Sequence, residues 1–393
     1  MEFSTVIYYF ITMVKMTPIF IALALASCAL GAGQLPFTVV SEEGTFAVEE
    51  VVENLDHPWS LAFLPDGGGI LVTERPGRLL LVRSGDVTPV RGTPEVAVEG
   101  QGGLLDVALS PEFDEDALVY MSFAEAGPGG YGTAVARGRL VLEGAGAPRL
   151  DAAEVIFRAL PRTGGGRHFG SRLAFSGGYL FVTLGERGTM DRAQDTHDPY
   201  GGVLRLLPNG TVPDDNPFAP GGASAGGGAP ELWSYGHRNA QGLTVRPGTE
   251  DLWLHEHGPR GGDEINIVRA GANYGWPLVT YGIDYDGTVI SSETSAPGIE
   301  EPVLYWVPSI APSGMTFYEG AAFPLWQGDL FVGALAGKHL RRVEFEGNVP
   351  VRQEVLLQNR LGRIRDVRTG PDGLLYLLTD ESDGGLYRIS PAD

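Results

Sequence analysis

The sequence predicts a single all-β domain folded as a six-bladed β-propeller. Turn-forming residues are frequent, with 57 Gly and 28 Pro among 393 residues, and this favours many short strands over long helices. Alternating apolar segments also recur along the chain with Pro/Gly/Asp turns between them, as expected for an array or propeller. One all-β domain of this length is larger than most sandwiches, whereas a propeller accommodates it.

Six copies of one phrase give the predicted blade number. Each copy has an apolar strand, a turn and a second apolar strand, and successive copies begin about 45 to 70 residues apart. The copies are LAFLPDGGGILVTERPGRLLLV from Leu61, LLDVALSPEFDEDALVYMSF from Leu104, RLAFSGGYLFVTLGERG from Arg172, GLTVRPGTEDLWLHEHG from Gly242, MTFYEGAAFPLWQGDLFVGAL from Met315 and RIRDVRTGPDGLLYLLTDE from Arg363. Flanking strands complete each blade, and closure into a ring leaves only short edges. We therefore expect residues 34–393 to form one propeller domain.

Residues 1–33 are predicted to be an export segment and linker. Lys15 precedes the apolar run Ile19–Ala26, which suits a signal peptide and is short for a membrane span. The tetrapeptide ending at Cys28 resembles a bacterial lipoprotein cleavage box, so Cys28 could carry a lipid anchor; an ordinary signal peptide cleaved near Ala32 would discard it. Both alternatives predict a periplasmic or cell-envelope protein. With one cysteine in the chain, the mature fold has no disulfide.

The charge balance excludes several partners. The formal net charge is −21, from 49 acidic and 28 basic residues, which argues against a surface for nucleic acid or anionic membranes. The sequence has no GxxxxGKS/T phosphate loop and no GxGxxG opening a helix after a strand, so a nucleotide cofactor has no support. Composition leaves the oligomeric state open between monomer and homodimer.

The segment 231–276 concentrates polar groups between apolar strands. Arg238 and Asn239 supply a fixed charge and amide donors. The bend at Gly258–Pro259 has carbonyls that could face a cation, and the pair Asp263–Glu264 adds carboxylate oxygens, although such a pair is often a solvated loop. This segment is the first candidate for an ion- or ligand-binding site.

Arg363 and Arg365 form a second candidate. On a strand their side chains share one face, with Ile364 on the other, and each guanidinium can bind a carboxylate in a bidentate pair. A structural pair bonded to Asp366 or to another blade is the alternative. With Arg238 arriving from another repeat, a polyanionic ligand is the better account.

The residues that precede the repeated phrases should converge, because the inner strands of a propeller begin around its central channel. These residues are Gln101, His168, Arg238, Lys338, Arg363 and Arg365. His168 lies where a loop enters a strand, and an ordinary pKa of about 6.5 suits a general base, with a structural histidine as the alternative. His255 and His257 share a strand face, but no third ligand at useful spacing supports a transition metal.

Several ordered motifs resemble one family. They are EGQGGLLDVALSPEF from Glu99, GGRHFGSRLAF from Gly165, SYGHRNAQGL from Ser234, EHGPRGGDEIN from Glu256, GANYGWP from Gly271, GIDYDG from Gly282 and GRIRDVRTGPDGLLYLLTDE from Gly362. Together they are similar to the aldose sugar dehydrogenases, bacterial relatives of soluble quinoprotein glucose dehydrogenase that use pyrroloquinoline quinone (PQQ) and calcium.

The resemblance implies a role for each candidate. His168 would be the general base and Gln101 would bind the sugar. The residues implied to bind PQQ, a planar tricarboxylate, are Arg238, Asn239, Tyr285, Lys338, Arg363 and Arg365. The carbonyls of Gly258 and Pro259 would hold a catalytic Ca²⁺, and Glu264 with the Tyr274 carbonyl would hold a structural one.

Two positions depart from the family pattern. Soluble glucose dehydrogenases have Asp immediately before the catalytic His, whereas this chain has Arg167, so a preference for glucose does not carry over. Family members often place a cofactor-binding Lys directly after an apolar strand; here that place is Ala334–Ala336, and Lys338 is the nearest lysine. Lys338 would therefore reach the cofactor from a shifted position.

The resemblance implies oxidation of aldoses at the anomeric carbon to lactones, dependent on PQQ and calcium, with electrons passed to an external acceptor. One alternative is a calcium-dependent lactonase or esterase on a propeller, since fold does not fix function. Another is a noncatalytic envelope lipoprotein that binds carbohydrate. The first alternative has no need for the arginine cluster, and the second leaves His168 without a purpose.

Overall fold

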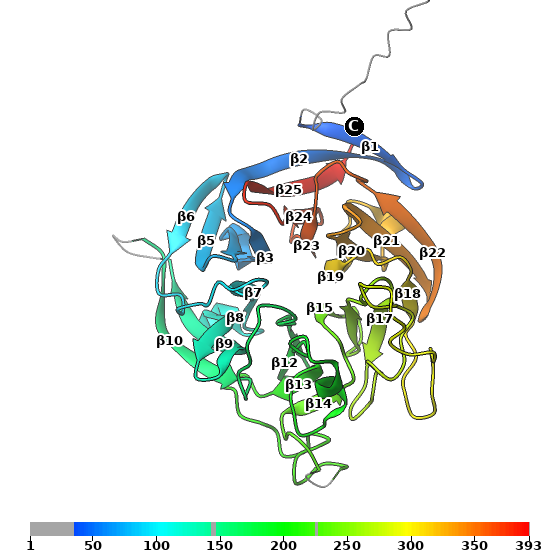
Figure 1. The fold of residues 1–393 in the computed structure, drawn as a ribbon. Helices are drawn as coiled ribbons and strands as arrows, with labels where there is room; N and C mark the ends of the chain where they lie inside the picture. The colour runs from blue at the N-terminus through cyan, green and yellow to red at the C-terminus, as the bar shows by residue number, and fades with distance from the viewer. Residues whose placement is uncertain (1–34, 143–146, 225–226, 393) are drawn as a thin grey trace, which may run out of the picture. The chain divides into compact units, whose positions relative to one another are not determined.

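A computed structural model describes residues 35–142, 147–224 and 227–392, and these form six antiparallel sheets arranged in a ring (Figure 1). The predicted six-bladed β-propeller is confirmed. Cys28 and the rest of the expected export segment lie outside the described residues. Within the described residues, no helix is long and apolar enough to cross a bilayer.

Each blade begins with an inner strand that contains or directly follows one predicted phrase start. The first blade has β3 (Pro58–Phe63), β4 (Ile70–Glu74), β5 (Arg78–Arg83) and β6 (Asp86–Val90). The second has β7 (Leu104–Leu109), β8 (Leu118–Gly127), β9 (Gly130–Val141) and β10 (Arg149–Arg158), and the third has β11 (Leu173–Ser176), β12 (Tyr179–Thr183), β13 (Gly202–Leu206) and β14 (Leu232–Tyr235). The fourth has β15 (Ala240–Val245), β16 (Leu252–Glu256), β17 (Asp263–Val268) and β18 (Leu304–Trp306), and the fifth has β19 (Pro312–Phe317), β20 (Leu330–Ala334), β21 (His339–Glu346) and β22 (Val349–Leu356). Helical turns are short: α1 (Phe113–Asp116), η1 (Pro65–Gly67), η2 (Met190–Gln194) and η3 (Pro324–Trp326).

The sixth blade closes the ring by combining both ends of the described chain. It contains β23 (Ile364–Thr369), β24 (Leu375–Thr379) and β25 (Gly384–Pro391), followed outward by β2 (Gly44–Leu55) and β1 (Phe37–Ser41). The register pairs Val48 with Ile389, so an N-terminal strand continues the ladder of the C-terminal strands. Backbone hydrogen bonds thereby fasten the first strands to the last blade (Figure 1).

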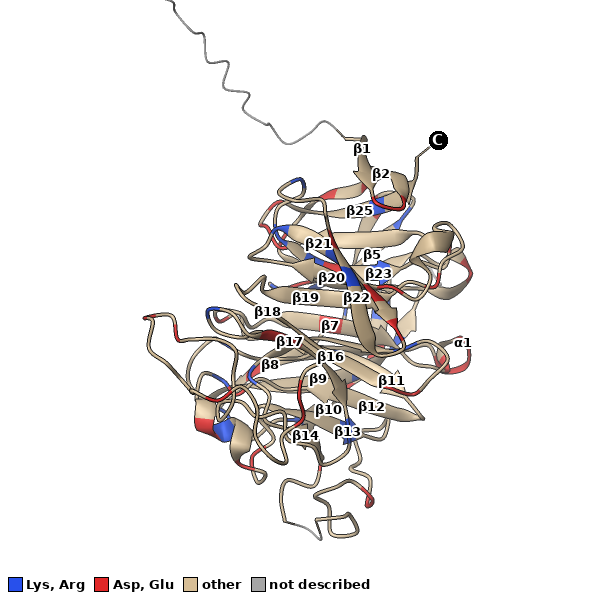
Figure 2. Cartoon of the chain, turned by 90° about the vertical axis from the view of Figure 1, so that its right-hand side faces the viewer, with Lys and Arg blue, Asp and Glu red and all other residues tan. Residues whose placement is uncertain are grey.

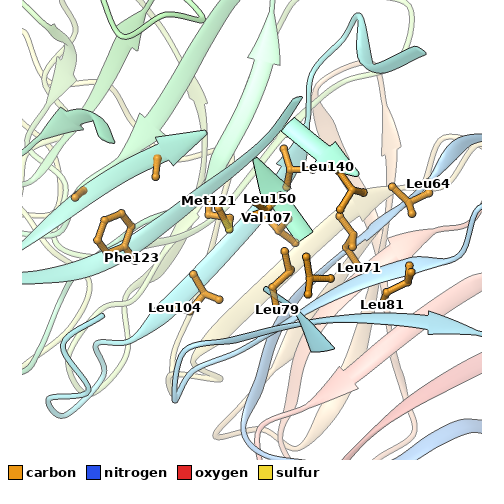
Figure 3. Packing of buried hydrophobic residues seen from close by; sticks show 14 residues of the cluster. Leu64, Leu71, Leu79, Leu81, Leu104, Val107, Met121, Phe123, Leu140 and Leu150 are labelled. Atoms are coloured by element: carbon orange, nitrogen blue, oxygen red, sulfur yellow. The ribbon is translucent and has the colours of Figure 1, made fainter. Parts of the chain in front are cut away.

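Apolar layers between adjacent blades form the core. Between the first and second blades, Leu71 and Leu79 pack with Leu104, Val107 and Met121, and all five are at most 3% exposed (Figure 3). Alternate residues of each strand face such a layer, as the period-two pattern predicts. Burial of one such side chain contributes about 1.5–3 kcal/mol, so the layers hold the inner strands at fixed positions.

A cluster of charges lies on or next to the inner strands, and we call it the channel plug: the buried residues Asp106, Arg172 and Asp366, and the partly buried Arg368. Arg172 is 1% exposed and lies 3.2 Å from Asp106 and 3.1 Å from Asp366. Arg368 lies 3.4 Å from Asp106 and 3.1 Å from Asp366. Two guanidinium groups thus balance two carboxylates. Other charged residues lie along the strands and loops of the blades (Figure 2).

Candidate active site

A cavity of about 280 Å³ lies on the axis, because all six blades contribute to its lining. Four of the predicted residues line it: Gln101, Asn239, Arg363 and Arg365. The other lining residues are Trp59, Arg75, Leu105, Phe169, Gly170, Gln241, His257, Ala311, Leu335 and Asp380. A larger cavity of about 540 Å³ lies beside the second blade, but its described lining has no histidine or arginine. The axial cavity is therefore the candidate site.

Arg363 and Arg365 meet at one carboxylate. Nη2 of each donates to Oδ2 of Asp380, at 3.2 and 2.8 Å respectively, and Arg365 also donates to Gln241 Oε1 at 3.2 Å. Burial alone would raise the pKa of Asp380, but Arg365 and Arg363 outweigh it and hold that pKa well below its usual range. Neither Asp366 nor a neighbouring blade supplies this partner. Two guanidinium groups share one carboxylate, which leaves a net positive charge at the cavity.

His168 is buried at the edge of the cavity, directly before two lining residues. It is 8% exposed, and Nδ1 lies 2.5 Å from Oε2 of Glu186, which is 1% exposed. If Nδ1–H donates to this carboxylate, Nε2 is left with a lone pair. Burial lowers the pKa of His168 and Glu186 opposes that shift, while Arg238 and Arg167 lower it further. The imidazole is therefore neutral near pH 7, with one ring nitrogen able to accept a proton.

The backbone at His168 has a left-handed conformation. Its φ is 55°, which costs a non-glycine residue about 1–3 kcal/mol and is most often found at functional sites. Gln101 stabilises this geometry through two hydrogen bonds. Its side-chain Oε1 accepts the backbone N–H of His168 at 2.7 Å, and its backbone N–H donates to Gly166 O at 2.6 Å. Gln101 therefore fixes the loop that carries the candidate base.

Arg238 lies beside the bend at Gly258. Its Nη1 donates to the carbonyls of His257 and Gly258 at 3.1 and 3.2 Å, and its backbone N–H donates to Glu256 Oε2 at 2.5 Å. Asn239 accepts a hydrogen bond from Gly170 N at 3.1 Å. Since the Gly258 carbonyl already faces a cationic group, its orientation suits a metal ligand.

Asp263 anchors this same bend. One carboxylate oxygen accepts from Gly258 N and Ser309 Oγ, at 2.9 and 2.8 Å, and the other accepts from Ile310 N and Ala311 N, at 2.7 and 3.1 Å. Although burial raises its pKa to about 6, these four donors favour the carboxylate form. Asp263 thus supports the Gly258 bend through the backbone.

Glu264 and Tyr274 line a second, much smaller cavity together with Glu256 and Arg238. Glu256 and Glu264 stand opposite each other on β16 and β17. Burial and then the Glu256 charge raise the pKa of Glu264 to about 8. Glu256 is engaged by His237 Nδ1 at 2.8 Å. Among the described residues no basic side chain forms an ion pair with Glu264, whose carboxylate oxygens are of the type that hard divalent cations bind.

Backbone carbonyls would have to complete any metal site. Among the described residues, no group of three or more His, Cys, Asp or Glu side chains is placed to hold a metal ion. His255 is fully buried on β16, with no hydrogen-bond partner at either ring nitrogen, whereas His257 Nε2 lies 2.5 Å from Pro312 O. The two histidines share no ligand position.

Three of the predicted cofactor-binding residues do not line the axial cavity: Arg238, which lines the smaller cavity, and Lys338 and Tyr285. Lys338 is exposed in the turn between β20 and β21, where its carbonyl accepts a hydrogen bond from Asn359 N at 2.8 Å. Tyr285 is 64% exposed on a loop, with its ring centroid 6.0 Å from the Arg238 guanidinium carbon. Neither side chain contributes to the cavity lining.

Sequence reasoning missed three groups that complete the site: Glu186, Asp380 and Trp59. Glu186 and Asp380 are acidic residues just after the second strand of a blade, at the same end as the candidate residues. Position after a strand was the only available signal. Trp59 is 3% exposed, and the guanidinium carbons of Arg172 and Arg365 lie 4.1 and 5.7 Å from its ring centroid.

Comparison with known proteins identifies the family of the chain. Residues 55–388 match the family model described as Glucose / Sorbosone dehydrogenase. Aldose sugar dehydrogenase YliI of Escherichia coli (strain K12) is 47% identical over 353 residues, which cover 88% of this chain and 93% of that protein. A crystal structure of the soluble aldose sugar dehydrogenase from E. coli in the apo form has a TM-score of 0.84 and 46% identity, covering 88% of this chain and 100% of the other. The PQQ-bound form of aldose sugar dehydrogenase from Streptomyces coelicolor has a TM-score of 0.72 and 30% identity, covering 88% and 98%. This chain belongs to the glucose/sorbosone dehydrogenase family.

Proposed function

We propose that the chain is a PQQ-dependent aldose sugar dehydrogenase that oxidises its substrate at the anomeric carbon to a lactone. The family and the names of its relatives support this assignment. The observation that carries it is the axial cavity, where Arg363 and Arg365 share a single carboxylate and where the lining residues Phe169 and Gly170 directly follow the buried His168. The excess positive charge suits a tricarboxylate, and the imidazole suits removal of a hydroxyl proton.

Different residues of the chain accept the proton, bind the sugar and limit the access of water. His168 Nε2 accepts the proton of the anomeric hydroxyl, and Glu186 at Nδ1 stabilises the resulting imidazolium. Gln101 uses its carbonyl on His168 N–H, which leaves its amide nitrogen to donate to a sugar hydroxyl. Bound PQQ supplies the acceptor for the hydride leaving the anomeric carbon. Trp59, Leu105 and Phe169 give the cavity apolar walls that limit water.

Calcium is part of the same proposal. The Gly258 and Pro259 carbonyls would hold one Ca²⁺, supported by the cation-facing orientation of Gly258 O. Glu264 and the Tyr274 carbonyl would hold a second ion, supported by the facing carboxylates of Glu256 and Glu264. Ca²⁺ prefers such carbonyl and carboxylate oxygens. Electrons would leave to an external acceptor.

A reconstitution assay tests the function. The protein is purified without cofactor, and dye reduction is followed with a panel of aldoses after adding PQQ and Ca²⁺ separately and together. We expect turnover only with both. If PQQ neither supports dye reduction nor binds in an absorbance titration, the dehydrogenase assignment is wrong, and hydrolysis of lactones becomes the activity to measure.

We further propose that the protein is exported to the periplasm or cell envelope and anchored through Cys28. Only the N-terminal sequence supports this proposal. Metabolic labelling with a radioactive fatty acid should mark the parent chain but not Cys28→Ala, and the variant should move from the membrane to the soluble envelope fraction. A parent chain that stays unlabelled and soluble would argue for an ordinary signal peptide.

A further inference from the structure

Arg187 is a buried cation directly after Glu186, in the connection that follows β12. It is 4% exposed and forms no ion pair with any described residue. Burial lowers its pKa to about 10, so the guanidinium remains charged near pH 7. Charged groups are seldom buried without an opposite charge, because their desolvation is then not offset by a strong attraction. A contribution to stability therefore does not explain why a charged Arg187 is buried here.

The contacts of Arg187 fall on both sides of His168. Its Nη1 donates to the carbonyl of Arg167, and its Nη2 donates to Gly165 O at 2.7 Å. Its guanidinium carbon also lies 3.5 Å from the ring centroid of Phe169. One planar group thus fixes two carbonyls before the histidine and the side chain after it, using the fork geometry that distinguishes arginine from lysine.

This loop needs such support. Residues 164–166 are three consecutive glycines, and a Cβ added at Gly164 or Gly165 would meet no atom within 4 Å. The segment therefore has little side-chain packing of its own before Phe169. His168 nevertheless adopts φ 55° and Ser171 adopts φ 87°, conformations that persist only when neighbouring contacts impose them.

We propose that Arg187 is a positioning residue that holds the 165–169 loop so that His168 faces the axial cavity. Glu186 binds the imidazole itself, and Arg187 binds the backbone and ring around it. Two adjacent residues thus fix the orientation of the base and the path of its loop. The inference rests on the proposed role of His168. Its structural part, the holding of the loop, is measurable without turnover.

The test compares Arg187→Met and Arg187→Lys with a matched control, Arg342→Lys. Arg342 is 1% exposed in the fifth blade, so its replacement also disturbs a buried arginine but leaves the loop untouched. PQQ affinity is measured by absorbance titration, and turnover of the aldose that reacts fastest in the reconstitution panel is expressed per PQQ-loaded site. This normalisation removes any loss that comes from unfolded protein. Hydrogen exchange of peptides covering 165–170 is measured by mass spectrometry in the absence of substrate.

We expect Arg187→Met to lower kcat per loaded site about 100-fold, because small displacements of a reacting group have effects of this size. KM and PQQ affinity should stay within about threefold, since neither depends on the orientation of the base. Exchange should accelerate in the 165–170 peptides and remain unchanged in the fifth blade. Arg187→Lys keeps the charge without the fork and should show the same changes to a smaller extent. If Arg187→Met does not fold, Arg187→Lys tests by itself whether Arg187 holds the 165–169 loop.

The proposal would be overturned by a kcat per loaded site within about twofold of the parent in a folded Arg187 variant, or by unaltered exchange at 165–170. A drop in kcat for Arg342→Lys as large as that of Arg187→Lys would also overturn it, because the effect would then be general. If the parent itself shows no PQQ-dependent turnover, the proposed function fails. The exchange comparison still decides whether Arg187 holds the loop.

Discussion

The channel plug and the axial cavity contain the same residue types but differ in charge balance. In the plug, Arg172 and Arg368 face two carboxylates, and each lies within 3.4 Å of both. In the cavity, Arg363 and Arg365 share Asp380 alone. The plug arginines are balanced by an equal number of carboxylates, whereas Arg363 and Arg365 outnumber their carboxylate and line a cavity. Surplus charge next to a cavity therefore marks the binding site better than the presence of buried arginines.

Neighbouring residues of one strand belong to the two clusters. Arg365 lines the cavity, whereas Asp366 lies in the plug. The pairing of β23 with β24 has a register shift between Ile364 and Asp366, so Arg365 is an extra residue in the ladder. A bulge of this kind redirects a side chain and is common next to active sites. The same short segment can thereby stabilise the ring and bind a ligand.

The largest expected effect is the loss of catalytic rate when His168, at the edge of the cavity, is replaced. His168→Ala should lower kcat by about 10²- to 10⁴-fold, the usual range for a general base, while PQQ affinity stays close to the parent. Turnover per PQQ-loaded site is the measurement. Undiminished turnover would remove His168 from the mechanism.

Disrupting the channel plug should lower the free energy of unfolding instead of the catalytic rate. Asp106→Asn leaves Arg172 and Arg368 with one carboxylate, and removing one partner of a buried ion pair typically costs about 3–5 kcal/mol. Urea unfolding monitored by fluorescence gives the free energy of unfolding. A loss below about 1 kcal/mol would show that the plug does not stabilise the ring.

Matched glutamine variants of two arginines compare the clusters directly. Arg365→Gln should weaken PQQ binding about 10- to 100-fold, the equivalent of one charge-assisted hydrogen bond. Arg368→Gln lies only three residues along the strand and should reduce stability while the folded protein keeps its PQQ affinity. Equal losses of affinity in both variants would contradict the division into plug and cavity.

Asp380→Asn should have a smaller effect with a definite pH dependence. Because the folded pKa of Asp380 is depressed, its contribution to stability is complete above its unfolded pKa of about 3.9 and is lost as the pH falls towards the folded value. The variant should melt below the parent at pH 7, and the difference should shrink below about pH 4. A difference that is constant with pH would contradict the pairing with Arg363 and Arg365.

The smallest expected effect is a shift in the pH profile. Burial lowers the pKa of His168, so kcat/KM should fall on the acid side with a midpoint below the ordinary value of about 6.5. Steady-state rates between pH 4 and 8, with PQQ and Ca²⁺ saturating, provide the profile. A midpoint above the ordinary value would mean that Glu186 outweighs burial.

The sequence by itself determined the blade number and four of the polar residues that line the cavity. Strand periodicity and turn chemistry are local, so six repeated phrases predicted six sheets, and residues before inner strands were expected to converge. Gln101, Asn239, Arg363 and Arg365 do line one cavity. Only the tertiary structure showed that Glu186 meets His168, that Asp380 joins the two arginines, and that Lys338 lies outside the cavity. Such contacts depend on how connections from separate strands approach one another after the ring has closed, and spacing along the chain carries no information about that approach.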